Sequence, residues 1–201
     1  MIYQNEDQMK RGCESILACQ EGDVCVLNES SFREKLIDDL IYTAVFSPDP
    51  AIQEAAAFLI RRGAASMGIL PASIQSLYEA MGRKEVRGFT VPAINIRGIT
   101  YHVAQAVFRA AIKGNVGPVI FEIARSEIGY TKQRPREYAC NVLAAAIKSG
   151  WCGHVSLQGY QFQMNAKNID ADGDNHTHAD KDLLREPIQA SICHIDIVTS
   201  T

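Results

Sequence analysis

Polar side chains follow four apolar runs of the sequence, and their types could do chemistry together. Because the active groups of parallel α/β sheets gather at the carboxyl ends of the strands, we expect these residues to share one site. Their guanidinium and hydroxyl groups suit a polar, phosphorylated ligand. In chain order they are Asn95 and Arg97, then Glu122, Arg125 and Ser126, then Tyr160, Gln161 and Gln163, and last Asp196 and Thr199 to Thr201.

The third of these runs reads HVSLQGYQFQ over residues 154–163. Its apolar alternation ends in a glycine and a polar cluster, which is typical of a buried strand whose tip faces a site. The tip carries a phenol and two amides, and it carries no acid, base or strong metal ligand. A strand aimed at a site therefore supplies nothing that reacts readily.

A second group of polar residues occupies every second position from 170 to 180. An extended segment would place all of them on one side, which suits a divalent cation. The glycine spacing differs from that of an EF-hand loop. The alternative is a solvated polar loop, and His176 and His178 are the weaker metal candidates. The group is Asp170, Asp172, Asp174, His176, His178 and Asp180.

The elements that must position these residues alternate from residue 89 onward. Strand-like runs at 89–96, 118–124, 154–159 and 193–200 are separated by helix-like segments, which predicts βαβ units and a parallel sheet. The runs are apolar on both faces, as expected where helices cover one side and a barrel core the other. We interpret residues 126–135 as a loop.

Residues 1–88 show helical patterns instead. Apolar residues spaced three and four apart predict a helix over 32–46, and Asp49-Pro50 suits the start of the next. Residues 23–28 fit a strand or a loop. We therefore divide the chain into a helical N-terminal extension, 1–88, and a (β/α) region, 89–201.

The composition excludes several classes of protein. The chain has 201 residues, 47% of them hydrophobic, and a net charge of −3, which gives no electrostatic case for nucleic acid or an anionic membrane. No apolar run is long enough for a membrane span. The six cysteines form no CxxC pair, so we expect thiols in a reducing compartment and a cytoplasmic protein.

Three segments, FTVPAINIRG, PVIFEIARSEIGYT and VSLQGYQFQ, together resemble the class II fructose-bisphosphate aldolase family in order and spacing. The resemblance implies a (β/α)8 barrel and a reversible, zinc-dependent aldol cleavage, in which zinc acts as a Lewis acid on the ketose carbonyl. The N-terminal region resembles an extension carried by a longer-chain branch of the family. The fold class that we predict is α/β, a partial (β/α)8 TIM barrel of about four βα units behind that extension.

The resemblance also implies roles for single residues. Asn95, Glu122 and Ser126 match positions that face the substrate in the family, and Arg97, from its place after the first strand, joins them as an expected contact to a phosphorylated sugar. Tyr160 occupies the position of the family's proton-transferring aspartate, and Gln161 that of a zinc-binding histidine. A tyrosine is mostly protonated at neutral pH, and a glutamine amide is a weak ligand for zinc. The chain as given ends at Thr201, before the family's later histidine ligands.

Three hypotheses follow from these departures. The first is a fragment or diverged copy of an aldolase with little or no cleavage of fructose 1,6-bisphosphate on its own. The second is a non-catalytic half-barrel module that binds sugar phosphate or forms a homodimer through its open sheet edges. The third is a truncated reading frame whose product barely folds.

Overall fold

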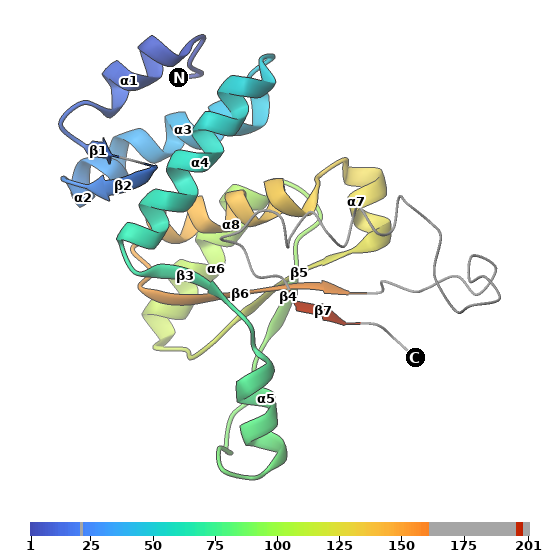
Figure 1. Ribbon diagram of the computed structural model, residues 1–201. Coiled ribbons are helices and arrows are strands. Elements are labelled where there is room, and N and C mark those ends of the chain that lie inside the picture. The colour runs from blue at the N-terminus through green and yellow to red at the C-terminus, as the bar shows by residue number, and fades with distance from the viewer. Residues whose placement is uncertain (21, 161–195, 199–201) are drawn as a thin grey trace, which may run out of the picture. The chain divides into compact units, whose positions relative to one another are not determined.

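The computed structural model describes residues 1–20, 22–160 and 196–198. They form two compact units that alternate along the chain. The first unit takes residues 1–70, 99–117 and 139–155, and the second takes 71–98, 118–138 and the described residues from 156 onward. Figure 1 labels the helices and strands of both.

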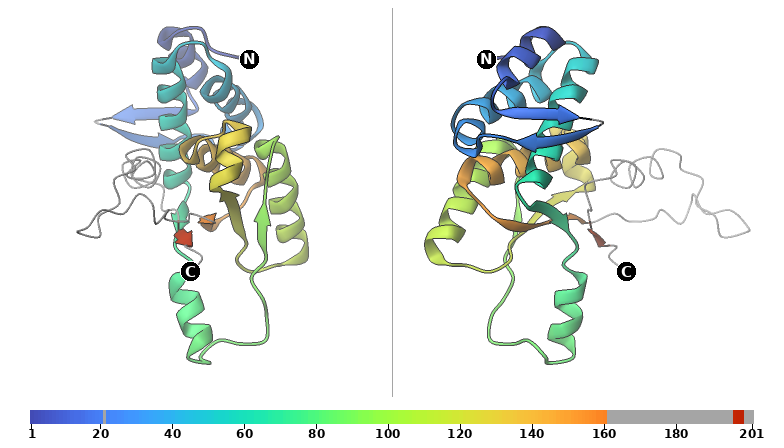
Figure 2. Two further views of the ribbon diagram at one scale, coloured as in Figure 1. Left: turned by 90° about the vertical axis from the view of Figure 1, so that its right-hand side faces the viewer. Right: turned by 60° about the vertical axis from the view of Figure 1, so that its left-hand side comes forward.

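The first unit is mainly helical and contains one small hairpin. Its strands β1 and β2 pair antiparallel, with Leu17 opposite Val26, and Figure 2 shows them side by side. Residues 23–28, which fit a strand or a loop, thus contribute a strand. The elements are α1 (Glu6–Cys13), β1 (Leu17–Gln20), β2 (Asp23–Val26), α2 (Glu29–Ser31), the π-helix η1 (Phe32–Leu36), α3 (Ile37–Phe46), α4 (Pro50–Ser66), α6 (Thr100–Gly114) and most of α8 (Pro135–Ser149).

Helices α3 and α4 confirm two of the predictions made for this region. The helical segment 32–46 exists as the π-helix η1 continued by α3, with its apolar stripe buried. Asp49 caps α4 by accepting a hydrogen bond from the Ala51 amide at 2.8 Å, and Pro50 is the first helical residue. Gly63 allows close packing here, because a Cβ at that position would lie 2.7 Å from Cζ of Phe32.

A carboxylate ties three helices of the first unit together. Asp38 on α3 accepts hydrogen bonds from the Tyr101 hydroxyl of α6 at 2.6 Å and from Lys148 Nζ of α8 at 2.7 Å. Lys148 also donates to the Glu34 carbonyl at 3.0 Å. Burial, followed by the hydrogen bond to Asp38, raises the pKa of Tyr101 far above its usual value, so this phenol stays protonated.

The second unit is built around a parallel sheet. The strand order is β3–β6–β5–β4, with β7 also paired to β6, and the pairs β4–β5, β5–β6 and β6–β7 are parallel. The predicted parallel α/β sheet is therefore confirmed. The elements are β3 (Ile69–Ala72), which begins in the first unit, α5 (Gln75–Gly82), β4 (Ala93–Asn95), β5 (Ile120–Ala124), α7 (Arg125–Thr131), β6 (Gly153–Tyr160) and β7 (Asp196–Val198).

The first predicted strand, 89–96, is shorter than expected, because only Ala93–Asn95 is extended and paired. Pro92 lies just before it and has no N–H to donate to a ladder. Its carbonyl still accepts from the Ile120 amide at 2.9 Å, so the pairing with β5 begins at the proline.

The two faces of the sheet differ in polarity and burial. Phe121 and Leu157 pair in register on one face and are almost fully buried. The opposite face carries Asn95, Glu122 and Gln158, which are also in register and only half-buried. Because side chains alternate between faces, a polar row crosses three strands of the sheet.

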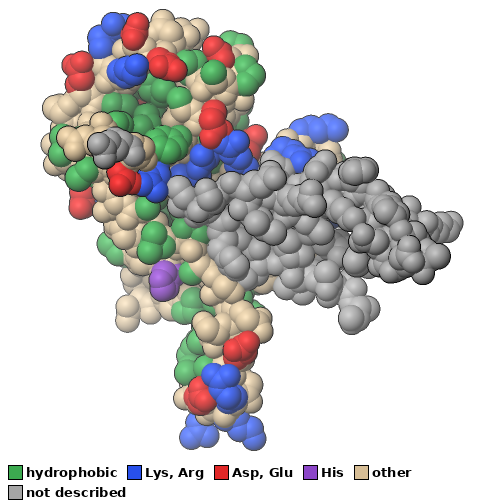
Figure 3. All heavy atoms as spheres, viewed as in Figure 1, with side chains coloured by type: hydrophobic (Ala, Val, Ile, Leu, Met, Phe, Trp, Pro, Cys, Tyr) green, Lys and Arg blue, Asp and Glu red, His purple; other side chains and the backbone are tan. Residues whose placement is uncertain are grey.

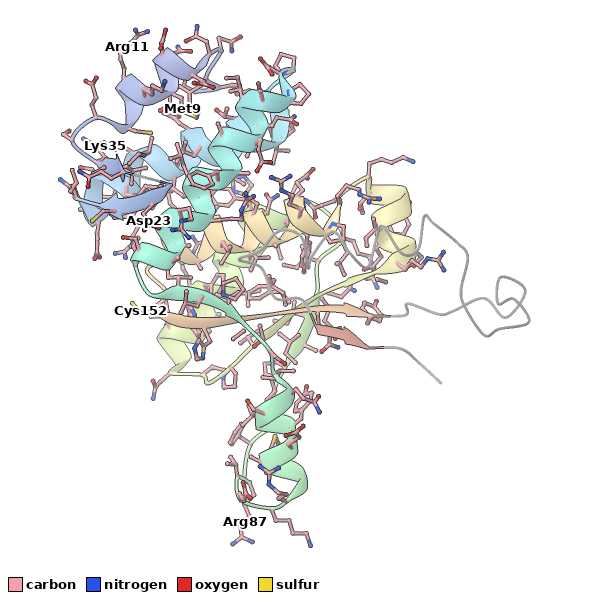
Figure 4. All side chains as sticks on the ribbon, in the orientation of Figure 1. Met9, Arg11, Asp23, Lys35, Arg87 and Cys152 are labelled. Carbon is pink, nitrogen blue, oxygen red and sulfur yellow. The ribbon has the colours of Figure 1, made fainter. Side chains whose placement is uncertain are left out.

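Helix α5 contains no buried residue. Figure 3 shows charged side chains gathered on α5 and the turn after it, where Arg83, Lys84 and Glu85 are exposed. Arg87 lies at the end of this segment that is farther from the sheet (Figure 4). Within the described ranges, no helix has the length and apolar content that a membrane span requires.

Candidate functional site at the strand ends

The polar row lies at the carboxyl ends of the parallel strands. Asn95 ends β4, Glu122 lies in β5, and Gln158 lies in β6 beside it. Gln158 Nε2 donates to Glu122 Oε1 at 2.7 Å. In backbone register the row continues to Asp196 of β7. Burial, and then the charge of Glu127, raise the pKa of the Glu122 carboxyl above its usual value.

Glu127 is the centre of the site, although the sequence pattern predicted no role for it. Its carboxylate accepts hydrogen bonds from Asn95 Nδ2 at 2.8 Å, Arg97 Nε at 2.6 Å and the Ala124 amide at 2.8 Å, and from the Tyr160 hydroxyl at 3.5 Å. One buried carboxylate thus joins the ends of three strands and the segment after β4.

The local fold explains why Glu127 reaches these groups. The segment 126–135 was predicted as a loop, and that prediction is wrong for its first part, because α7 runs from Arg125 to Thr131. Glu127 is the third residue of α7 and accepts from the amide of Ala124, the residue before the helix, which is half of a capping box. Since Ala124 has no side-chain acceptor, the usual Ser/Thr signal of this motif is missing from the sequence.

The charge of Glu127 is well stabilised. Its burial raises the pKa, but the hydrogen bonds from Ala124, Asn95 and Arg97 and the charge of Arg97 lower it more, so that the pKa lies below its usual value. Glu127 is therefore an anion at neutral pH, and its paired guanidinium has a raised pKa.

Arg97 and Asn95 present polar groups that this network does not fully use. The Arg97 side chain is 62% exposed although its Nε is bonded to a carboxylate that is 4% exposed. Asn95 Oδ1 is buried and has no hydrogen-bond partner in the part of the chain that the structure describes. The amide cannot be reversed without turning its oxygen toward the Glu127 carboxylate. An acceptor without a described donor therefore belongs to the same hydrogen-bond network as an exposed cation.

Tyr160 joins the same network as a donor and acceptor. Its hydroxyl accepts from Asn95 Nδ2 at 2.8 Å and donates to Glu127. Burial and then the negative charge of Glu127 raise its pKa. A phenol with a raised pKa is protonated at neutral pH and is a poor base there.

The predicted site residues are thus only partly brought together. Asn95, Arg97 and Tyr160 meet around Glu127, and Glu122 lies in the neighbouring row with Gln158. Ser126 is exposed on the first turn of α7. Gln161, His176 and His178 lie outside the described residues.

The described residues at the strand ends do not fit zinc. The tips supply amides, a phenol and two carboxylates that already accept hydrogen bonds, whereas zinc takes thiolate, imidazole or carboxylate ligands in a tetrahedral set. Among the residues that the structure describes, no three His, Cys, Asp or Glu side chains are grouped to hold a metal ion.

The five described cysteines are free thiols. Cys13 and Cys140 are buried, and Cys19, Cys25 and Cys152 are exposed. Burial, and then the charge of Cys19, raise the pKa of the Cys13 thiol to about 11. Cys13 is therefore protonated and unreactive at neutral pH.

Comparisons with known protein families, with curated proteins and with solved structures find no match to this chain. The resemblance to class II aldolases therefore rests on the three sequence segments that contain Asn95, Glu122 and Tyr160.

Proposed function

We propose that the parallel sheet is the first half of an aldolase-type (β/α) barrel and that its strand-end face binds a phosphorylated sugar with little or no aldol cleavage. The observation that supports this most is the buried Asn95 Oδ1, which has no donor among the described residues and belongs to the same Glu127 network as the exposed Arg97. A buried acceptor without a donor costs about 1–3 kcal/mol, which a ligand hydroxyl would recover.

The chemistry of the ligand follows from the groups that face it. Sugar hydroxyls can donate to Asn95 Oδ1 and to the carboxylate of Glu122, while a phosphate group suits the neighbouring guanidinium. We expect little or no aldol cleavage because the site has no residue suited to proton transfer. Tyr160 occupies the position of the aspartate that transfers the proton in the family. Its raised pKa leaves a smaller deprotonated fraction at neutral pH than in an ordinary tyrosine, so less of it can accept a proton.

Binding and turnover can be tested on the same preparation. Titration of fructose 1,6-bisphosphate should give saturable binding, and Asn95→Ala should weaken it at least about tenfold, since one donor–acceptor pair to a polar ligand is lost. Gln75→Ala is the matched control, because it removes an amide from the exposed helix α5 of the same unit. A coupled assay with added zinc should detect no triose phosphate, and measurable zinc-dependent cleavage would contradict the proposal.

A second candidate function is self-association. Among the described strands, β4 pairs only with β5, so its other edge is available to another strand. A second copy that paired there would continue the sheet. Light scattering after size-exclusion chromatography should then give the mass of a dimer, and a monodisperse monomer at high concentration would exclude this pairing.

A further inference from the structure

The pair formed by Arg97 and Glu127 is asymmetric. The carboxylate is buried, at 4% exposure, while the guanidinium is 62% exposed and held through Nε at 2.6 Å. An exposed arginine at the strand ends is the natural group to receive a phosphate. Here it already has an anionic partner.

The anion is fixed independently of the arginine. The Ala124 amide and Asn95 Nδ2 both donate to Glu127 Oε2, whereas Arg97 Nε donates to Oε1. If Arg97 turned toward a ligand, the carboxylate would stay in place, held by its other donors. A phosphate at Arg97 would then meet a negative charge that cannot move away.

We propose that Glu127 is a built-in counter-ion that weakens anion binding at Arg97, so that this face selects ligands by their hydroxyl groups more than by their phosphate charge. The inference rests on the proposed function in one respect, namely that the strand-end face is the ligand site. It makes Glu127 a positioning residue that sets specificity without touching the ligand.

The substitution Glu127→Gln separates this role from a structural one. Glutamine keeps the shape and can accept from the Ala124 amide, but it removes the charge. Two unit charges about 4 Å apart interact by about 1 kcal/mol even in water, so the affinity for inorganic phosphate and for fructose 1,6-bisphosphate should rise at least about fivefold. A residue with only a structural role would weaken or leave unchanged the binding of both.

Glu85→Gln is the matched control. It removes a carboxylate of the same unit that also accepts a hydrogen bond from an arginine Nε, that of Arg83 at 2.7 Å, but it lies on the exposed turn after α5. Its effect on the affinity for inorganic phosphate should be less than about threefold, and thermal unfolding should show that both variants are folded. An equal gain in the two variants would mean that general charge removal explains the result and would overturn the inference.

Arg97→Met completes the test. In the wild-type chain it should reduce phosphate affinity less than about threefold, because Glu127 already neutralises the arginine, and in the Glu127→Gln background it should abolish the gain. A tenfold loss in the wild type would overturn the inference even if Glu127→Gln did not fold. A wild type that does not bind fructose 1,6-bisphosphate, together with a Glu127→Gln variant that still gains affinity for inorganic phosphate, is a separate outcome. That result would contradict the proposed function and would support the role of Glu127 as a counter-ion.

Discussion

Two carboxylates of this protein have similar partners and different surroundings. Asp38 in the first unit and Glu127 in the second each accept hydrogen bonds from a tyrosine hydroxyl and from a cationic side chain. At Asp38 the partners come from α6 and α8, and they tie helices together. At Glu127 the partners come from strand ends, and the network leaves a guanidinium exposed and a buried amide oxygen without a donor in the described part of the chain.

A carboxylate with a tyrosine and a cationic partner can therefore serve either packing or ligand binding. A closed network has every donor and acceptor used by the fold itself, as expected of a structural carboxylate. A network that leaves a buried acceptor unused at the tips of parallel strands has a group to offer a ligand. We therefore expect changes at Asp38 to affect stability alone and changes around Glu127 to affect both stability and binding.

Glu127→Ala should have the largest effect on stability. It leaves the Ala124 amide without its acceptor and removes one partner of Asn95 Nδ2 and of Arg97. We expect the free energy of unfolding to fall by about 3 kcal/mol, because buried donors lose charged acceptors. Urea unfolding monitored by circular dichroism measures this, and a change under about 0.5 kcal/mol would show that the network is not formed in solution.

Asp38→Ala should have a smaller effect of a different kind. Its carboxylate is about one-third exposed, so loss of the bonds from Tyr101 and Lys148 should cost about 1–2 kcal/mol. The affinity for fructose 1,6-bisphosphate should not change. A tenfold change in that affinity would show that Asp38, like Glu127, affects ligand binding, and would contradict the difference drawn between the two carboxylates.

The sequence predicted the helices and strands around Asp38 and Glu127 better than it predicted the role of Glu127 itself. The spacing of apolar residues gave the helix that continues through Asp38 and the parallel strands that end near Asn95 and Tyr160, because burial patterns are local and periodic. The capping of α4 by Asp49 was equally readable. These features depend on neighbours in the sequence.

Glu127 was missed because its role depends on partners far along the chain. Asn95 and Tyr160 are 32 and 33 residues away from it, and their meeting is set by the register of β4, β5 and β6. The local sign, an acid three residues after the end of a strand, lacked the serine or threonine that marks a capping box. Because residues 126–135 were predicted to be a loop, no helix was expected to carry Glu127 to the strand ends.

The pH dependence of stability should distinguish the two acids of the second unit. The lowered pKa of Glu127 means that its contribution is present above the pKa it has in the unfolded chain and is lost as the pH falls through its folded pKa. The pKa of Glu122 is shifted the other way, upward. The ionised Glu122 carboxylate therefore destabilises the fold, and this effect appears as the pH rises from the pKa of the unfolded chain to the pKa of the folded chain. Unfolding free energies measured from pH 7 downward should therefore fall less at low pH in Glu127→Gln, and Glu122→Gln should gain stability near neutral pH.

The direction in which each variant's stability differs from that of the wild type is the control in that experiment. If Glu122→Gln loses stability at neutral pH, its carboxylate is stabilised by the row of amides instead of being penalised by burial. The assignment of Glu122 as the weaker acid of the pair would then be wrong.

Tyr160→Phe should have the smallest effect. Its hydroxyl donates only a weak hydrogen bond to Glu127, at 3.5 Å, and Asn95 Nδ2, from which it accepts at 2.8 Å, keeps Glu127 as an acceptor in the variant. We expect a loss of about 0.5 kcal/mol in unfolding free energy. Tyr101→Phe, which removes the 2.6 Å bond to Asp38, is the matched variant in the first unit and should lose more. A larger loss at Tyr160 would reverse the ranking of the two phenols.

We propose that the strand-end face around Asn95 and Glu127 binds a phosphorylated sugar. Calorimetric titration of fructose 1,6-bisphosphate into the wild-type chain and into its Asn95→Ala variant is the decisive measurement. We expect saturable binding to the wild type and at least about tenfold weaker binding to the folded variant. No binding to the wild type, or equal binding to both, would contradict it.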